Sequence, residues 1–493
     1  MEFDKPRPPR GSEPTPEEFL PSLIPWIHGS RWHMEETGTI TLAAQCEIAR
    51  EGNDRTLWLV IASGERLYNV PLVVATSATK NDDDVTQGLI ATVGSWSLYD
   101  ATSHPLGQRA LFSLLVDSEG AEKTPDTTGD SLFNHGEKTF SFTSLPLHGL
   151  SGPVSTAQRL TSEQSNTSII YHFNDQTPII IKLFRVLASG HNPDVELQLA
   201  LDASGTVPRQ YGSVSMRYQS KTAQTGEQGA ISAGREDAVV VDGVDAVDEA
   251  DVLVAQEFLE SAKDAWQVIS DELAHTDGSL GEMEESIRAL GSLTRTIHDG
   301  LASVFPVVPA SSERRAALRH SWRERAHSAI KLVPELSAHE GTIEIMYSAT
   351  EHVHWPELQR IHGDYHLGQV LEVPGRGWFA LDFEGEPLRP MAERTREDLA
   401  LRDVAGMLRS FDYAAGSAQM AGGAPEAIEE WARSAKEIFL SGYGELSEEE
   451  MVLLEALVLD KALYEVVYEA TERPAWLPIP LAGISQLMGS ASD

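Results

Sequence analysis

Hydrophobic and polar positions alternate over short stretches in the first half of the chain. Between residues 38 and 93, four apolar runs are separated by turn residues such as Glu51–Asp54, which is typical of antiparallel β-sheet. A second β-like region holds Ser168–Phe173 and Pro178–Phe184. After it, Asp194 follows Pro193 and opens an amphipathic pattern, which predicts the start of a helix. The four runs are Thr39–Ala44, Leu57–Ala62, Val70–Ala75 and Gly88–Val93.

From about Glu257 the apolar positions follow a spacing of 3.6 residues, which predicts long helices. The sequence therefore predicts an α+β chain with a β-rich first half and a mostly helical second half. Its 493 residues are too many for one hydrophobic core, so we expect two to four structural units. The predicted helices are Ser286–Val304, Glu313–Leu332, Pro425–Ser441 and Ser447–Thr471.

Three polar segments interrupt these patterns. Residues 1–20 carry five prolines and are expected to form a frayed arm. Residues 120–130 are expected to form a loop or a boundary. The acidic stretch between Glu236 and Asp251 is expected to be a solvated hairpin or a disordered insert, with metal binding as the alternative.

Composition narrows the possible partners. The chain has 38 Lys and Arg against 75 Asp and Glu, a net charge of −37, which disfavours binding to nucleic acid and to anionic membranes. We find no apolar run long enough to span a membrane and no signal-peptide pattern at the N-terminus. The single cysteine, Cys46, excludes an internal disulfide. We therefore expect a soluble, cytoplasmic protein, in which a polyanion would need a local positive site made by metal ions, a lysine or backbone N–H groups.

The most informative segments are Ile361–Val370 (IHGDYHLGQV) and Trp378–Glu386 (WFALDFEGE). Phosphoryl transfer needs a carboxylate beside the attacking hydroxyl, Mg²⁺ held by oxygen ligands, and a cation on the phosphates. Asp364 supplies the carboxylate on a turn. A short hairpin across residues 373–377 would bring Asp382 beside Gln369, giving two oxygen ligands for Mg²⁺.

This pattern resembles the catalytic and metal loops of the aminoglycoside-phosphotransferase-like branch of the protein-kinase-like fold, and more closely those of actinobacterial maltokinases. The resemblance covers about Thr161 to Leu487. The segments that carry it are 163–168, 182–185, 192–196, 256–259, 361–369, 381–387, 402–413, 459–465 and 473–481.

The resemblance implies a two-lobed α+β fold. Its parts would be an N-terminal cap subdomain over residues 1–100, the rest of the N-lobe with the nucleotide-binding sheet over 101–258, and a helical C-lobe over 259–493. ATP would lie in the cleft between the lobes.

The resemblance also assigns roles on the nucleotide side. Asp364 is the expected catalytic base, and Gln369 and Asp382 are the expected Mg²⁺ ligands. Lys182 would grip the phosphates with Glu196 as its ion-pair partner. The hairpin of Ser165, Asn166, Thr167 and Ser168 would face the phosphates, and the backbone of the Gln256–Phe258 hinge, including Phe258, would bind adenine. His362, Asp403 and Arg409 would brace the catalytic loop.

The acceptor side is expected on the last long helical pattern. Lys461, Tyr464, Glu465 and Tyr468 follow the spacing of one helix face, which taken alone is also typical of an ordinary amphipathic helix. With the resemblance, Lys461, Tyr464 and Glu465 become expected sugar contacts. His366 could contact the sugar as well, and Trp476 is either a core residue or a wall of the same pocket.

The expected reaction is direct in-line transfer from ATP to maltose, giving maltose 1-phosphate, with Mg²⁺ as cofactor and trehalose synthase as a possible partner. The segment Ile27–His33 keeps only Arg31 and Trp32 of the basic, aromatic segment usual in maltokinase caps. Glucosamine kinase therefore stands as the alternative.

Two other classes of function fit the residues less well. A pseudokinase-like binding module is disfavoured by intact Asp364, Gln369, Asp382 and Lys182. An antibiotic phosphotransferase would suit the acidic composition, whereas the segment from Lys461 to Leu481 resembles sugar kinases instead.

Overall fold

The computed structural model describes residues 13–34, 39–76, 88–116, 140–150, 153–160, 166–219, 247–386 and 391–490. These residues belong to two units. Unit 1 comprises Met1–Val195 and Gln210–Phe258, and unit 2 comprises Glu196–Arg209 and Leu259–Asp493. The chain passes from one to the other within helix α3 (Pro193–Leu201). Ser165, the 120–130 loop and most of the acidic stretch predicted above lie outside the described residues.

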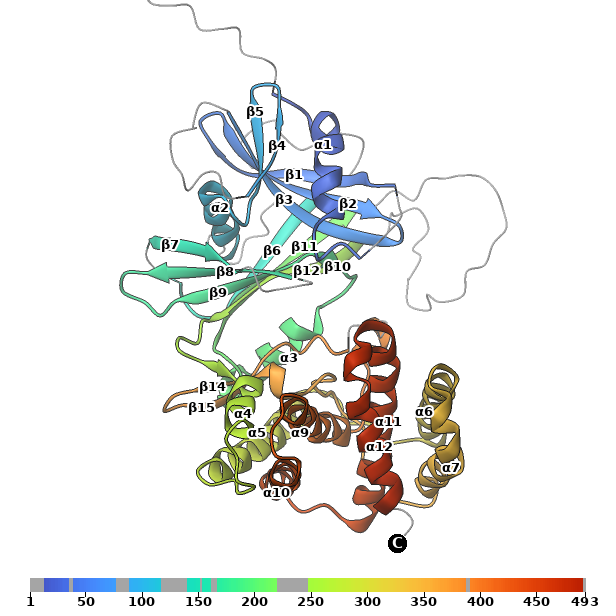
Figure 1. The fold of residues 1–493 in the computed structure, drawn as a ribbon. Helices are drawn as coiled ribbons and strands as arrows, with labels where there is room; N and C mark the ends of the chain where they lie inside the picture. Colours follow the sequence, from blue (N-terminus) through green and yellow to red (C-terminus); the bar gives the residue numbers. More distant parts are fainter. Residues whose placement is uncertain are drawn as a thin grey trace, which may run out of the picture. The chain divides into compact units, whose positions relative to one another are not determined.

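Unit 1 contains a first antiparallel sheet with the order β1-β2-β3-β5-β4, and the short strand β10 pairs with β3 (Figure 1). The four predicted apolar runs correspond to β1, β2, β3 and β4, whereas β5 and β10 were not predicted. Nearly every residue of β2 and β3 is buried, because side chains on both faces of these strands enter a core. Their bounds are β1 Thr41–Glu51, β2 Asp54–Ser63, β3 Arg66–Thr76, β4 Leu89–Val93, β5 Trp96–Asp100 and β10 Val186–Leu187.

Helix α1 (Pro16–His28) lies against this first sheet. It corrects the predicted frayed arm over residues 16–20, whereas residues 1–12 lie outside the described residues. Its Thr15 and Glu18 form a capping box, which satisfies the first N–H groups of the helix. A proline at the first helical position is also favourable. Its apolar face buries Phe19, Leu23 and Ile27, and Pro16 marks the start of the helix.

The second sheet of unit 1 has the order β6-β11-β12-β9-β8-β7. Strands β8 and β9 confirm the second predicted β-region. Ser168 on β8 lies opposite Lys182 on β9, and Lys182 lies opposite Val254 on β12. Helix α2 (Pro105–Val116) packs against this sheet in a shared core. The strands are β6 Phe140–Pro146, β7 Val154–Arg159, β8 Asn166–Phe173, β9 Ile179–Phe184, β11 Gln210–Gln219 and β12 Val247–Glu257.

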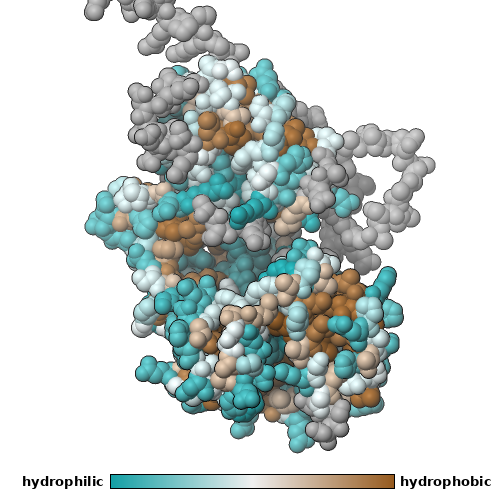
Figure 2. All heavy atoms as spheres, viewed as in Figure 1, coloured by the Kyte–Doolittle hydropathy of each residue, from teal (hydrophilic) through white to brown (hydrophobic). Residues whose placement is uncertain are grey.

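Unit 2 is mostly helical and has one continuous core. Its helices α5, α6, α10 and α11 confirm the four predicted helices to within a few residues. Among the described residues, no helix combines the length and apolar character needed to cross a bilayer, and hydrophilic residues cover much of the face shown in Figure 2. The helices are α4 Ala265–Leu273, α5 Met283–Val304, α6 Ser312–Leu332, α7 Glu340–Ala349, α8 Met391–Arg394, α9 Leu401–Met420, α10 Pro425–Tyr443, α11 Glu448–Glu472 and α12 Pro478–Ser490.

A small sheet in unit 2 carries the predicted hairpin. Strands β14 (Val370–Val373) and β15 (Gly377–Ala380) pair antiparallel, and β13 (Lys263–Asp264) pairs with β14. The hairpin places residue 369, just before β14, near residue 381, just after β15, because Leu381 N–H donates to the Gln369 carbonyl at 2.9 Å.

Helices α5 and α10 pack with almost no space between their backbones (Figure 1). A Cβ added to Gly442 would lie 2.1 Å from the Arg288 carbonyl oxygen. We expect Gly442→Ala to lower the free energy of unfolding by about 2 kcal/mol, because the clash is with backbone that cannot rotate away. Chemical denaturation measures this loss.

The matched control is Gly341→Ala on α7, where an added Cβ would meet nothing within 4 Å. We expect no loss of stability there, since alanine favours helix over glycine. Equal losses in both variants would show that the α5–α10 contact is not the cause.

Candidate active site

The loop that carries Asp364 is held by one buried carboxylate on α9. Asp403 accepts hydrogen bonds from His362 N–H at 2.8 Å and Gly363 N–H at 2.9 Å. His298 Nε2 lies 3.0 Å from the same carboxylate. Burial alone would raise the pKa of Asp403, but the bonds from His298 and Gly363 and the nearby imidazoles lower it below its usual value. The predicted bracing role of Asp403 is confirmed.

His362 ties this loop to the segment after β15. Its Nε2 lies 2.8 Å from the Leu381 carbonyl oxygen and donates to it. Gly363 has a φ of +86°, and a Cβ there would lie 3.3 Å from the Gly385 Cα, so the two segments pass closely because both residues are glycine. The expected structural role of His362 is thereby confirmed.

The hairpin brings the two predicted metal ligands together. Gln369 Nε2 donates to Asp382 Oδ2 at 3.1 Å, and carboxylate oxygens of Asp382 and Glu384 lie within 4.8 Å of each other. Asp382 has a φ of +62°, a conformation that a non-glycine residue adopts at some energetic cost and that is common at functional sites. This group of amide and carboxylate oxygens fits Mg²⁺, which prefers oxygen ligands.

Asp364 has a cationic neighbour on α11. Lys461 Nζ lies 3.3 Å from Asp364 Oδ1 and 2.6 Å from Glu386 Oε1. Burial alone would lower the pKa of Lys461, but the Glu386 and Asp364 carboxylates raise it well above its usual value, so the ammonium stays charged. Lys461 also lies 4.9 Å from the centre of the Tyr464 ring. The structure thus brings together Asp364, Lys461 and Tyr464.

Glu386 is the residue of this group that sequence reasoning missed. It is 3% exposed and pairs with Lys461. An available signal was its place at the end of the WFALDFEGE segment. A second acidic residue this close to the metal loop is explained by a lysine that needs a partner.

Glu465, a predicted sugar contact, is bonded to an arginine in the structure. Its Oε2 accepts two bonds from the buried Arg409, at 2.7 and 3.0 Å, so its carboxylate is held in the core of unit 2. Trp476 is half-buried and stacks on Tyr413 with ring centres 6.5 Å apart. A direct sugar contact by either residue stays a prediction.

His366 keeps one ring nitrogen facing Asp364. Gly368 N–H donates to His366 Nδ1 at 3.0 Å, so in the neutral imidazole the proton lies on Nε2, 4.0 Å from Asp364 Oδ2. The surrounding protein lowers the pKa of His366 below its usual value, chiefly by burial. A neutral donor beside the carboxylate of Asp364 suits a contact with a sugar hydroxyl.

On the nucleotide side, unit 1 presents Lys182 with Asp194, which corrects the predicted pairing with Glu196. Lys182 Nζ lies 2.9 Å from Asp194 Oδ2, and Glu196 instead pairs with Arg360 at 2.7 Å. Residues two apart in a helix point to nearly opposite sides, so α3 directs Asp194 and Glu196 to different partners. Lys182 is half-buried, and a lysine that has lost much of its water requires a carboxylate partner, as expected.

The predicted phosphate-facing residues divide between the two faces of β8. Ser168 lies opposite Lys182, and Asn166 shares the Ser168 face because side chains alternate along a strand. Thr167 faces the other way, and its hydroxyl accepts a bond from the buried Arg185 at 2.8 Å. Thr167 is therefore placed wrongly by the prediction.

The hinge prediction meets a constraint from the backbone. Phe258 N–H donates to the Pro178 carbonyl at 2.9 Å, so this donor is engaged within unit 1. Gln256 is half-buried, and its backbone pairs with Ile180. A contact between Phe258 and adenine would have to use its carbonyl or its ring.

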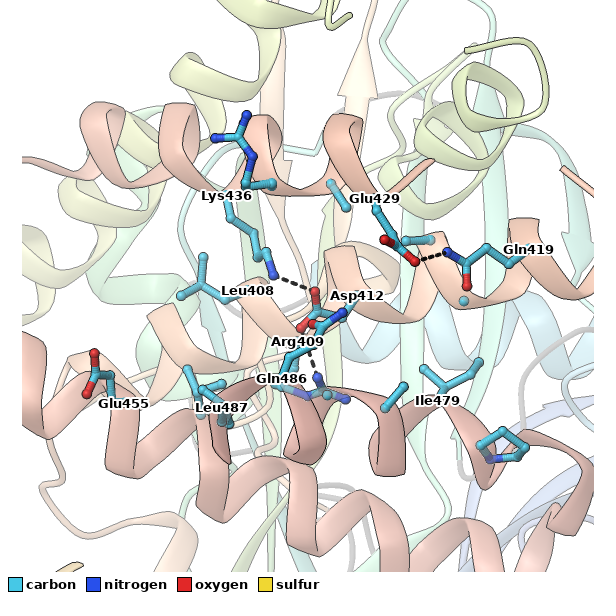
Figure 3. Close-up of a pocket in the computed structure, with 18 of the residues that line it drawn as sticks. Leu408, Arg409, Asp412, Gln419, Glu429, Lys436, Glu455, Ile479, Gln486 and Leu487 are labelled. Carbon is cyan, nitrogen blue, oxygen red and sulfur yellow. Dashed lines mark hydrogen bonds and ion pairs between the residues drawn. The ribbon is translucent and has the colours of Figure 1, made fainter. Parts of the chain in front are cut away.

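A cavity of about 860 Å³ lies among α9, α10, α11 and α12. Lys436 and Arg409 both point toward Asp412 in it, at 2.6 and 2.8 Å (Figure 3). Its lining includes none of the residues predicted for catalysis or acceptor binding. The candidate active site is therefore the Asp364 group rather than this cavity.

No protein-family model matches the chain, whereas individual proteins are similar to it. A glucosamine kinase of Mycolicibacterium smegmatis is 26% identical over 262 residues, which cover 49% of this chain and 64% of that kinase. A glucosamine kinase of Streptacidiphilus jiangxiensis is 26% identical over 248 residues, which cover 47% of this chain and 56% of that kinase. The chain thus spans somewhat under two thirds of each of these relatives.

Solved structures match over almost the whole chain. A glucosamine kinase in complex with glucosamine, ADP and inorganic phosphate has a TM-score of 0.62 at 18% identity, covering 92% of this chain and 96% of that one. A second glucosamine kinase structure (crystal form B) has a TM-score of 0.62 at 19% identity, covering 92% and 95%. This likeness confirms the predicted α+β kinase-like fold.

The buried Asp403 makes stability depend on pH. Because its pKa is lowered in the folded chain, its ionised form contributes stability above the usual aspartate pKa of about 4, and this contribution is lost as the pH falls through the folded pKa. We expect Asp403→Asn to lower the free energy of unfolding at pH 7 by about 2 kcal/mol. The difference in the free energy of unfolding between Asp403→Asn and wild type should narrow below pH 4.

Chemical denaturation at pH 7 and at pH 3 measures both effects, with Asp271→Asn on the exposed side of α4 as the control. A gap that stays constant between the two pH values would contradict this assignment of the charge.

Proposed function

We propose that this chain is an ATP-dependent phosphotransferase that phosphorylates a hydroxyl of a small sugar. The observation that carries the proposal is the Asp364 loop. Asp403 holds it in place, and the Gln369–Asp382 oxygens follow it on a hairpin. This arrangement occurs in a kinase-like fold, where positioning and electrostatics account for most of the catalysis.

Asp364 would orient the acceptor hydroxyl and accept its proton. The hydroxyl oxygen would attack the γ-phosphorus of ATP, the bond to the β,γ-bridging oxygen would break, and ADP would leave without a covalent enzyme intermediate. Lys461, bonded to both Asp364 and Glu386, would fix the carboxylate against rotation. Gln369 and Asp382 would hold Mg²⁺, which neutralises phosphate charge when bound.

Lys182 would supply the cation that binds the nucleotide phosphates. Its 2.9 Å bond to Asp194 orients the ammonium. A local positive group is needed in a chain with a net charge of −37, because ATP would otherwise be repelled.

We propose glucosamine, an amino sugar, as the acceptor in place of maltose. The glucosamine kinase relatives support this choice, and nothing found in the comparisons supports maltose or a trehalose synthase partner. Lys461 lies between two carboxylates, those of Asp364 and Glu386, and the one negative charge in excess in this group favours a cationic sugar.

The acceptor is tested by ADP release with Mg-ATP against glucosamine, glucose, maltose and an aminoglycoside. We expect turnover with glucosamine, because its ammonium suits the acidic surroundings. Asp364→Asn should lower kcat by at least about 100-fold with nucleotide affinity nearly unchanged. Turnover with maltose alone would move the acceptor assignment, and full activity of Asp364→Asn would reject the catalytic role.

Lys461 is tested separately from the fold. We expect Lys461→Met combined with Glu386→Gln to lower kcat by about tenfold or more, because Asp364 loses its fixed orientation. The paired change avoids leaving a buried carboxylate without a cation. Steady-state kinetics should show Lys331→Met, at an exposed position on α6, to be silent. Unchanged kcat in the double variant would contradict the role given to Lys461.

A further inference from the structure

One arginine in unit 1 joins the two sheets. Arg185 directly follows β9 and is fully buried. Its Nη2 donates to both oxygens of Asp100 at 2.9 and 3.1 Å, and its Nε donates to Thr167 Oγ1 at 2.8 Å. Asp100 ends β5 of the first sheet, and Thr167 belongs to β8 of the second. One guanidinium therefore bonds both sheets.

The first sheet and the segment after α1 contact this arginine and the backbone beside it. The guanidinium lies 5.3 Å from the centre of the Trp32 ring. Asn69 N–H donates to the Arg185 carbonyl at 2.8 Å, and Asn69 Nδ2 donates to the Phe184 carbonyl at 2.8 Å. The backbone at the end of β9 is therefore fixed as firmly as the side chain.

Asp100 is matched to this task. It is 1% exposed and also accepts a bond from Arg159 at 3.0 Å. Burial alone would raise its pKa, but the two arginines lower it, so the carboxylate is charged. A planar guanidinium can bond Asp100 and Thr167 simultaneously in a fixed geometry, which lysine cannot reproduce.

The strands held in this way carry the candidate phosphate-binding side chains. Thr167 lies between Asn166 and Ser168, and Ser168 lies opposite Lys182 in the sheet. Lys182 lies three residues before Arg185 on the same segment. Fixing Thr167 from the back of β8 therefore fixes the face on which Ser168 and Lys182 lie.

We propose that Arg185 is a positioning residue for nucleotide binding, held by Asp100 of the first sheet and by Trp32 of the segment after α1, so that β8 and β9 keep Ser168 and Lys182 in a fixed register. This inference rests on the proposed function, because it takes Lys182 as the nucleotide-binding group. It gives the first sheet a role in nucleotide binding and a reason for Trp32 in an otherwise divergent segment.

The mildest test removes one bond. Thr167→Val deletes the acceptor for Arg185 Nε and keeps the shape of the side chain, whereas Thr167→Ser keeps the hydroxyl. By titration calorimetry with ADP and with ATP, we expect Thr167→Val to weaken nucleotide binding roughly tenfold and Thr167→Ser to bind like wild type. The KM for the acceptor should not change.

A second variant separates positioning from stability. Replacing a buried ion pair by apolar side chains is often neutral or stabilising, so Arg185→Met with Asp100→Leu should fold with a melting temperature near that of wild type. We expect its nucleotide affinity to fall at least as far as that of Thr167→Val. Arg109→Gln, which removes an exposed pair with Glu51, is the matched control.

The outcomes are distinct. Folded Thr167→Val and double variants that bind ADP and ATP like wild type would overturn the inference and leave the proposed function intact. An equal change of nucleotide and acceptor parameters would indicate a merely structural role and would also overturn it. Wild-type protein that binds neither nucleotide would overturn both the inference and the proposed function.

Discussion

The hold of Asp403 on two successive backbone N–H groups is the interaction on which the candidate site depends. A buried carboxylate that accepts N–H groups must find them in a fixed geometry, and it thereby fixes the turn that presents Asp364. His362 passes the constraint to the segment after β15. The positions of the candidate base and of the candidate metal ligands thus follow from a residue that touches no substrate.

The parts that the sequence predicted correctly have short-range causes. Helices α5, α6, α10 and α11 each carry their own apolar spacing, and Gln369 and Asp382 meet because a short hairpin leaves no other arrangement. Residues 16–20 of α1 were assigned to a frayed arm because the first 20 residues carry five prolines. In fact one of them begins the helix, where proline lacks only an N–H that would be unpaired anyway.

The parts that were missed depend on side-chain direction or on distant contacts. Asp194 and Glu196 are both acidic and nearly adjacent, so only the start of α3 decides which one meets Lys182. The burial of Glu386 depends on a lysine 75 residues further along the chain. Arg185 finds its partner 85 residues away in the first sheet. No local pattern contains these separations, and in both cases the cost of burying a charge explains the pairing afterwards.

The path of the chain after Phe184, from the second sheet to the first, limits how this protein could be shortened or recombined. The segment that carries Lys182 continues through Arg185 into β10, which pairs antiparallel with β3. Removal of the first sheet would leave β10 without its pairing partner, and it would leave the Arg185 guanidinium without Asp100 in an apolar interior. The first sheet therefore has to stay together with β8 and β9. A swap of this region between relatives would have to carry both parts.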